Sequence, residues 1–277
     1  MGNSTSQPKN KTGKKVVLQK IEHAKRTNIL SLTEHKLDEL PSQIFQLTKL
    51  RTLDLSKNKL QQLVGISELK ELKSLNCDDN LLNCAAIAPV STLPKLQSLS
   101  LGKNQLGNNG YASFPEMPSK IKTLKLHNNA ISTIPKQIVD CKLRVLEKLD
   151  LASNNLASIP KEIMNLVALT ELILDNNVIV SIPDELGLMK KLKALSLRNN
   201  YIQVKSTNFS SANPQPIPAS VFRDTLLIEL NLHGNPLSNT QLNCFEGFDE
   251  FLERRKKKKT SALSGGALVD MSVCGLE

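Results

Sequence analysis

The chain has 277 residues, with 36 lysines and arginines against 26 acidic residues, which gives a net charge of +10 at neutral pH. Hydrophobic residues make up 40% of the chain, aromatic residues only 3%, and tryptophan is absent, so a core has to be built from aliphatic side chains. No run of about 18 apolar residues occurs, and the basic start MGNSTSQPKNKTGKK has no apolar segment, so neither a transmembrane helix nor a secretory signal is expected.

The first six residues, MGNSTS, fit the pattern MGxxx[ST] for N-myristoylation, in which the acyl group is attached to the amine of Gly2. Four basic residues follow at Lys9, Lys11, Lys14 and Lys15. One myristoyl chain binds a bilayer only marginally, with a constant of about 10⁴ M⁻¹. Each lysine near an anionic leaflet adds roughly 1 kcal/mol. Residues 1–15 are therefore predicted to be a flexible, lipidated tail that holds the chain at a membrane surface. A chance match to this short pattern is the alternative.

Residues 16–26 place Val17, Ile21 and Ala24 at helical spacing, which predicts a helix with one apolar face. The repeats that follow would otherwise expose their first apolar layer. A helix that caps this end is therefore expected.

Residues 27–238 contain nine copies of the pattern LxxLxLxxNxL. The copies start at Thr27, Leu50, Leu72, Leu96, Ile121, Leu146, Leu169, Leu192 and Leu227. The LxL centre predicts a short strand with leucines on one face and polar residues on the other. A single unit cannot bury its apolar face, so the copies must stack into one parallel sheet.

Each copy except the first has an asparagine three residues after the last leucine of the strand. This asparagine ladder consists of Asn58, Asn80, Asn104, Asn129, Asn154, Asn177, Asn200 and Asn235. The chain turns inward at this point, where backbone groups would be buried without partners. The side-chain amides are predicted to pair these groups.

The connecting segments share a second pattern, [LI]Pxx[IL], as in LPSQI (40–44), IPKQI (134–138), IPKEI (159–163) and IPDEL (182–186). Together the two patterns resemble the leucine-rich-repeat family. The resemblance implies an α/β repeat solenoid, a horseshoe with a parallel concave β-sheet and an irregular or helical convex side. The proline pattern and both ends of the chain are similar to those of intracellular members of the family.

The last repeat step is 35 residues long, whereas the others are 22–25. The excess falls in residues 203–226, which are rich in serine, asparagine and proline and predict a mobile surface loop. It is interpreted as a tolerated insertion, with a partner contact as the alternative.

Residues 239–257 are predicted to form a helix that caps the far end, with Leu242, Phe245, Phe248 and Leu252 on one stripe and Phe251 beside it. The alternative is a partner-binding helix, which would require exposed rings. The run Arg254–Lys259 favours no single role among membrane support, a solvated helix end and nuclear import. Residues 258–277 are predicted to be disordered, and the ending CGLE departs from the prenylation pattern.

The polar positions of the strands line the concave face, and equivalent positions of neighbouring copies are adjacent in space. The central patch predicted to bind a partner consists of Lys125, His127, Asp150, Glu171, Ile173, Asp175 and Arg198. Ile173 is the one large apolar side chain in its column, and arginine is a frequent anchor of interfaces.

These features predict a non-catalytic scaffold or adaptor, monomeric and on the cytoplasmic face of a membrane, that binds an unidentified intracellular protein. A soluble regulatory subunit of a phosphatase or of small-GTPase signalling is the alternative. The four histidines are scattered and no phosphate-binding glycine loop occurs, so neither catalysis nor a cofactor is expected. Five cysteines at irregular spacing predict neither a metal site nor disulfides. Basic tails without interleaved aromatic residues argue against nucleic-acid binding.

Overall fold

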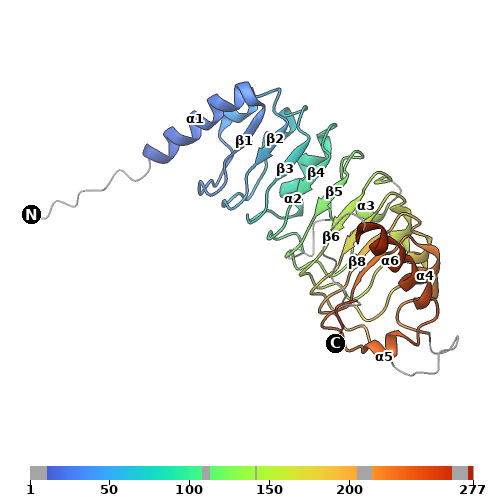
Figure 1. Cartoon of the computed structure of the whole chain (residues 1–277). Helices are drawn as coiled ribbons and strands as arrows, with labels where there is room; N and C mark the ends of the chain where they lie inside the picture. Colours follow the sequence, from blue (N-terminus) through green and yellow to red (C-terminus); the bar gives the residue numbers. More distant parts are fainter. Residues whose placement is uncertain (1–10, 108–112, 141, 205–213, 264–273, 277) are drawn as a thin grey trace, which may run out of the picture.

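The computed structural model describes residues 11–107, 113–140, 142–204, 214–263 and 274–276. In these residues nine strands form one parallel sheet whose order follows the chain, and the sheet lines the inner side of a curved solenoid (Figure 1). The strands are β1 (Ile29–Ser31), β2 (Thr52–Asp54), β3 (Ser74–Asn76), β4 (Ser98–Ser100), β5 (Thr123–Lys125), β6 (Lys148–Asp150), β7 (Glu171–Ile173), β8 (Ala194–Ser196) and β9 (Glu229–Asn231). The predicted solenoid with a parallel concave sheet is confirmed.

Short helical turns return the chain along the convex side. They are η1 (Ser42–Gln46), η2 (Ile66–Glu68), α2 (Cys84–Ile87), η3 (Ala88–Thr92), α3 (Lys136–Val139), η4 (Lys161–Asn165), η5 (Asp184–Leu188) and α4 (Ala219–Asp224). A proline stands directly before several of them, as Pro41, Pro160 and Pro183 do. Proline fixes φ near −65° and keeps the residue before it out of the helical conformation, so the helical turn starts only after the proline.

The core is a set of aliphatic layers stacked along the solenoid. The central leucine of each strand lies opposite the central leucine of the next, as Leu53, Leu75 and Leu99 do in β2, β3 and β4. These side chains are almost completely buried. Cys77 occupies a leucine position of the pattern and is buried with them, and its burial raises the pKa of the thiol.

The amide of each ladder asparagine pairs backbone groups of two neighbouring repeats. Asn154 Nδ2 donates to the carbonyls of Leu126 (3.0 Å) and Leu151 (2.9 Å), which belong to successive repeats. Its Oδ1 accepts from the amides of Asn129 (3.1 Å) and Ile131 (3.0 Å). The other ladder asparagines repeat these contacts, and all are buried except Asn104, which is half-buried. In the first repeat His35 does not replace the amide but contacts Lys20 Nζ of the capping helix.

The N-terminal end is covered by α1 (Lys11–Thr27), whose Val17, Ile21 and Ala24 are buried. The helix begins at Lys11 and not at residue 16, so residues 11–15 are helical although a flexible tail was expected there. Once a helix is held by its buried face, adding a turn costs little, because propagation is far easier than nucleation.

The C-terminal end is covered by two helices, α5 (Asn239–Leu242) and α6 (Phe248–Leu263), and the prediction of one helix over 239–257 is wrong. The chain turns at Gly247, whose φ of 86° is a left-handed conformation that glycine adopts without strain. Phe245, Phe248 and Phe251 are buried. Their burial fits a cap and removes the exposed rings that the partner-binding alternative requires.

The end of the predicted loop 203–226 is ordered in the described residues, where it forms α4. Phe222 of α4 packs edge-on against Phe248, with ring centroids 5.5 Å apart, and also contacts Phe251. The sequence IPASV (217–221) repeats the convex proline pattern with valine at its last position, which the sequence interpretation missed. The predicted mobility of residues 205–213 lies outside the described residues.

Replacing Asn154 by alanine leaves buried backbone groups of two repeats without partners, each at a cost of about 1–3 kcal/mol. We expect the free energy of unfolding, measured by urea titration with circular dichroism, to fall by about 2–4 kcal/mol. The matched control is Asn155→Ala at the exposed neighbouring residue, which is expected to change it by less than about 0.5 kcal/mol. Equal losses in the two variants would contradict the role of the amide.

Candidate protein-interaction face

Each repeat presents three polar positions on the concave face: one before, one between and one after the two leucines of its LxL centre. Because the strands pair in register from β1 to β9, equivalent positions form three columns that run across the strands. The middle column contains Lys125, Asp150 and Ile173, on β5, β6 and β7. Lys125 is exposed, whereas Asp150 and Ile173 are half-buried. These three predicted residues therefore stand side by side on neighbouring strands.

His127 and Asp150 form a pair at the centre of this face. His127 Nδ1 lies 3.4 Å from Asp150 Oδ2, at ion-pair distance, and within the described residues it is buried without a hydrogen bond. The Asp150 carboxylate raises the pKa of His127 against the opposing effect of burial. The imidazole lies over Gly102, where an added Cβ would come within 2.2 Å of His127 Nε2, so only glycine leaves room for the ring.

Asp150 itself is held by two groups. Burial alone would raise its pKa, but contact with His127 and a hydrogen bond from the Ala152 amide (3.0 Å) outweigh burial and lower it. The carboxylate is therefore ionised and fixed in position at neutral pH. The centre of the face presents a preorganised anion beside an imidazole.

Glu171, Asp175 and Arg198 lie further along the face. Glu171 is paired with Lys148 at 2.6 Å, so its charge is partly balanced. Asp175 Oδ1 accepts from Ser196 Oγ (2.6 Å) and from the Arg198 amide (2.8 Å), which orients the start of the loop after β8. The side chain of Arg198 is exposed and extends from this loop.

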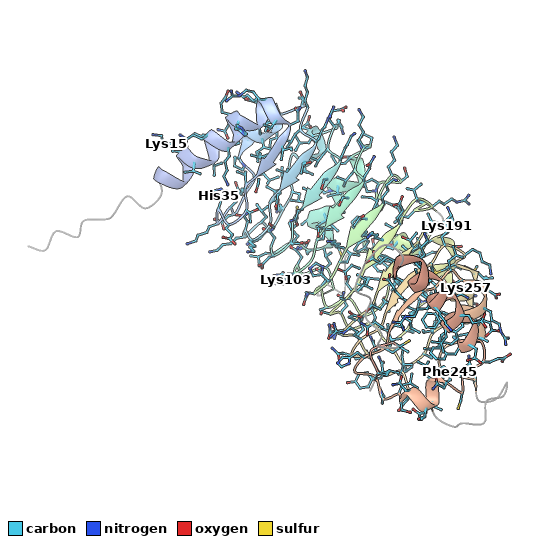
Figure 2. The ribbon with its side chains drawn as sticks, viewed as in Figure 1. Lys15, His35, Lys103, Lys191, Phe245 and Lys257 are labelled. Carbon is cyan, nitrogen blue, oxygen red and sulfur yellow. The ribbon has the colours of Figure 1, made fainter. Side chains whose placement is uncertain are left out.

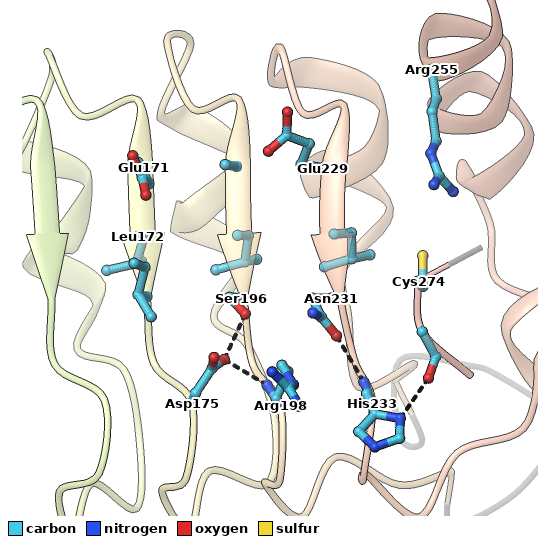
Figure 3. A pocket seen from close by; sticks show the side chains of 15 residues that line it. Glu171, Leu172, Asp175, Ser196, Arg198, Glu229, Asn231, His233, Arg255 and Cys274 are labelled. Carbon is cyan, nitrogen blue, oxygen red and sulfur yellow. Dashed lines mark hydrogen bonds between the residues drawn. The ribbon is translucent and has the colours of Figure 1, made fainter. Parts of the chain in front are cut away.

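A hollow of about 540 Å³ lies over β7, β8 and β9 (Figure 3). Four predicted patch residues line it, namely Glu171, Ile173, Asp175 and Arg198. Lys125, His127 and Asp150 lie outside it, so the structure divides the predicted patch into these three central residues and a hollow nearer the C-terminal end.

Other residues of the hollow were not predicted. Glu229 and His233 come from β9 and the loop after it, Arg255 from α6, and Cys274 and Gly275 from the C-terminal segment. Glu229 and His233 stand in the polar columns at the last repeat, so the repeat pattern could have placed them here. Arg255, Cys274 and Gly275 reach the hollow only because the chain folds back over the last strand.

Lys15 is the predicted membrane-facing residue whose side chain the structure describes. It is exposed on α1, at the opposite end of the solenoid from Lys257 on α6 (Figure 2). Lys11 and Lys14 belong to the same helix, with side chains outside the described part, and Gly2 and Lys9 also lie outside it. Two apolar side chains beside Lys15 are exposed, Val16 at 42% and Leu18 at 50%.

The basic run at residues 254–259 is divided by the fold. Arg254 donates from Nη1 to the Leu227 carbonyl (2.8 Å) and from Nη2 to the Phe222 carbonyl (2.5 Å). It thus connects α6 to α4 and to the last repeat. Lys256, Lys257 and Lys258 are exposed. The first residue of the run therefore has a structural role.

In the described part of the chain, no helix is both long and apolar enough to span a membrane. Within the same residues, no group of three or more His, Cys, Asp or Glu side chains is placed to hold a metal ion.

Replacing Asp150 by asparagine is expected to lower the pKa of His127, which can be measured by NMR titration of the imidazole. Because the folded pKa is raised, the pair stabilises the fold at pH values below the ordinary histidine pKa of about 6.5. This stabilisation is lost as the pH rises through the folded pKa. Asp175→Asn, which does not contact His127, is the control. A titration of His127 that is unchanged in Asp150→Asn would contradict the pairing.

Replacing Arg254 by glutamine leaves two carbonyls without their charged partner, which is expected to cost about 1–3 kcal/mol of unfolding free energy. Lys257→Gln removes the same charge from an exposed position and is expected to leave stability unchanged. The unfolding midpoints of both variants are measured in urea. If Arg254 were merely solvated, Arg254→Gln and Lys257→Gln would both unfold at the wild-type midpoint.

Comparison with known proteins shows what this architecture is similar to. A family model described as "Leucine rich repeat" matches residues 119–179 and 144–202. A solved leucine-rich-repeat protein of Leptospira interrogans superimposes with a TM-score of 0.53 at 26% identity, over 79% of this chain and 70% of that chain.

Among curated proteins, human Toll-like receptor 1 is 37% identical over 119 residues, which cover 41% of this chain and 14% of the receptor. Ras guanine nucleotide exchange factor V of Dictyostelium discoideum is 32% identical over 168 residues, which cover 51% of this chain and 8% of that protein. Bovine osteomodulin is 33% identical over 171 residues, which cover 57% of this chain and 38% of osteomodulin. The chain thus spans only a minor part of each relative. These names share no single activity, so the similarity lies in the repeats.

Proposed function

We propose that the chain is a member of the leucine-rich-repeat family, whose model matches residues 119–179 and 144–202, and that it is a non-catalytic scaffold or adaptor that binds a protein partner on its concave face. Leucine-rich repeats typically bind other proteins. The observation that supports this function is the hollow over β7–β9, where the apolar Ile173 and the exposed Arg198 lie together among charged groups. Arginine is among the residue types most enriched in interface hot spots.

The central pair extends this surface. His127 and Asp150 are held by their surroundings, so a partner that contacts them meets an imidazole and a carboxylate already in position. Preorganisation of this kind reduces the entropic cost of binding. Lys125 lies opposite Asp150 on the neighbouring strand and is an exposed cation.

We expect Arg198→Glu to weaken partner recovery by roughly tenfold or more, the size of a hot-spot loss. Partners are identified by proximity labelling from the full chain. Lys161→Glu, the same charge change on the exposed convex turn η4, is the matched control and is expected to recover the wild-type set. Identical partner sets from wild type, Arg198→Glu and Lys161→Glu would exclude the concave hollow as the binding surface.

The second part of the proposal is peripheral attachment to the cytoplasmic face of a membrane through a myristoyl group on Gly2. Support comes from the sequence MGNSTS and from α1, which follows it closely and presents Lys15 next to Val16 and Leu18. An acyl chain needs a second signal for stable attachment. Lysines and exposed apolar side chains on one short helix would supply it.

Gly2→Ala removes the acylation site, so the protein is expected to leave the membrane fraction after cell fractionation. Asn3→Ala, at the next residue, leaves the acceptor amine in place and is expected to retain membrane recovery. Neutralising Lys11, Lys14 and Lys15 to glutamine is expected to give an intermediate loss. Undiminished membrane recovery of Gly2→Ala would rule out lipid attachment.

A second candidate is a regulatory subunit of an intracellular signalling enzyme. It is favoured by two relatives, named as a Ras guanine nucleotide exchange factor and as leucine-rich repeat serine/threonine-protein kinase 1, the latter from Caenorhabditis elegans at 35% identity over 80 residues. A stoichiometric partner whose enzymatic activity changes on binding would distinguish this role from that of an adaptor.

The two ends of the chain support a placement within the family. The start MGNS, the lead-in IEHAKRTNILSL and the ending FEGFDEFLERRKKKK resemble those of leucine-rich repeat-containing protein 57, a small intracellular protein. The similarity excludes the 203–226 insertion and the residues after Lys259. We propose an intracellular, monomeric protein on this basis, with the membrane surface as its second partner.

A further inference from the structure

The outer edge of β9 is the last edge of the parallel sheet, and an uncovered edge exposes unpaired backbone groups. The described segment Cys274–Leu276 lies along this edge (Figure 3). The Leu232 amide donates to the Cys274 carbonyl at 2.8 Å. One repeat earlier, the Leu197 amide donates to the Asn231 carbonyl at the same distance. Cys274 therefore takes the hydrogen-bonding position that a tenth strand would occupy.

Three consecutive carbonyls of this segment are each recognised by a different group. Besides the Leu232 bond, His233 Nδ1 lies 2.9 Å from the Gly275 carbonyl, and Asn239 Nδ2 donates to the Leu276 carbonyl at 3.0 Å. A carbonyl only accepts, so Nδ1 of His233 carries the proton in this contact. The donors come from the main chain after β9, the adjoining loop and the first residue of α5.

The side chains of the segment fit the same place. Cys274 is 2% exposed, and its burial raises the pKa of the thiol to about 12. Leu276 packs against the core. Gly275 has a φ of 66°, and an added Cβ would lie 3.0 Å from Asn231 Oδ1 and 3.1 Å from His233 Cβ. The site thus accepts a buried small residue, a glycine and a leucine in order.

The segment also forms a wall of the hollow, because Cys274 and Gly275 line it together with Ile173 and Arg198. A partner bound over β7–β9 would meet this wall at the last strand. Release of the segment would uncover the β9 edge and lengthen the accessible concave face by one strand position.

We propose that the edge of β9 is a docking site for a short Cys-Gly-Leu turn, that residues 274–276 occupy it within the same chain, and that their release opens the end of the partner-binding hollow. The docking stands on the contacts of residues 274–276 alone. The regulatory consequence rests on the proposed function of the concave face.

The first experiment uses the reactivity of Cys274 in the full chain, measured by maleimide labelling with peptide mass spectrometry. Reactivity follows the accessible thiolate. Cys274 is expected to react at least about tenfold more slowly than the exposed Cys244 in the same molecule. Gly275→Val, which clashes with Asn231 and is strained at positive φ, is expected to make Cys274 as reactive as Cys244. Equal rates for the two cysteines in the wild type would overturn the docking.

A second variant, Leu276→Asp, breaks the docking through a different side chain and is expected to give the same acceleration. Protection that is independent of protein concentration supports occupancy within one chain. Protection that appears only at high concentration would overturn it in favour of exchange between copies. Unfolding midpoints of both variants at the wild-type value show that the solenoid itself is intact.

The site is then tested in trans with a fluorescent synthetic peptide of residues 271–277. Fluorescence anisotropy is expected to show binding to full-length Gly275→Val, whose site is vacated, and not to the wild type. Adding Asn239→Ala, which removes one donor, is expected to weaken this binding. Equal binding to wild type and Gly275→Val would overturn the docking site.

The regulatory step has its own readout. Gly275→Val is expected to recover more of the concave-face partner than the wild type does. Unchanged recovery, with Cys274 released and the peptide bound, would overturn the regulation while leaving the docking site in place. Loss of the partner in Arg198→Glu but not in Lys161→Glu tests the proposed function separately.

Discussion

Every turn of this solenoid carries the chain from the sheet into the interior, where backbone amides and carbonyls meet between two aliphatic layers. Water cannot reach these groups, so each must find a partner within the protein. The asparagine at the end of each strand meets this constraint, since its amide is short enough to bond groups of its own repeat and of the one before it. Neighbouring repeats are therefore joined by directional bonds as well as by apolar contact.

This constraint determines where function can lie. Inward positions of the repeat are occupied mainly by leucines and by the asparagine ladder, and several convex turns begin directly after a proline. Only the polar columns of the strands and the loops after them can vary without loss of a buried contact. The concave face has thus become a surface of fixed backbone and variable side chains, on which His127 and Asp150 are held beside each other and Ile173 and Arg198 border a hollow.

The ends of the solenoid present a different physical problem, because stacking stops there and the last layer has to be covered. The N-terminal end is closed by one amphipathic helix. The C-terminal end needs an aromatic cluster of Phe222, Phe248 and Phe251, an arginine that bonds two carbonyls, and a segment that pairs the sheet edge. The N-terminal end also carries much of the net positive charge, with seven lysines and arginines against one glutamate in residues 1–26.

The repeat pattern by itself determined the solenoid, the parallel sheet, the ladder of asparagines and the columns of the concave face. Each of these depends on residues at a fixed spacing in the sequence, and stacking of the repeats brings equivalent residues into contact. Only the tertiary structure decided that α4 is ordered against η5 and α6, that Arg254 is structural, and that Cys274 and Gly275 complete the hollow. These contacts join residues separated by irregular lengths of chain, so the repeat period does not predict which of them lie close together in space.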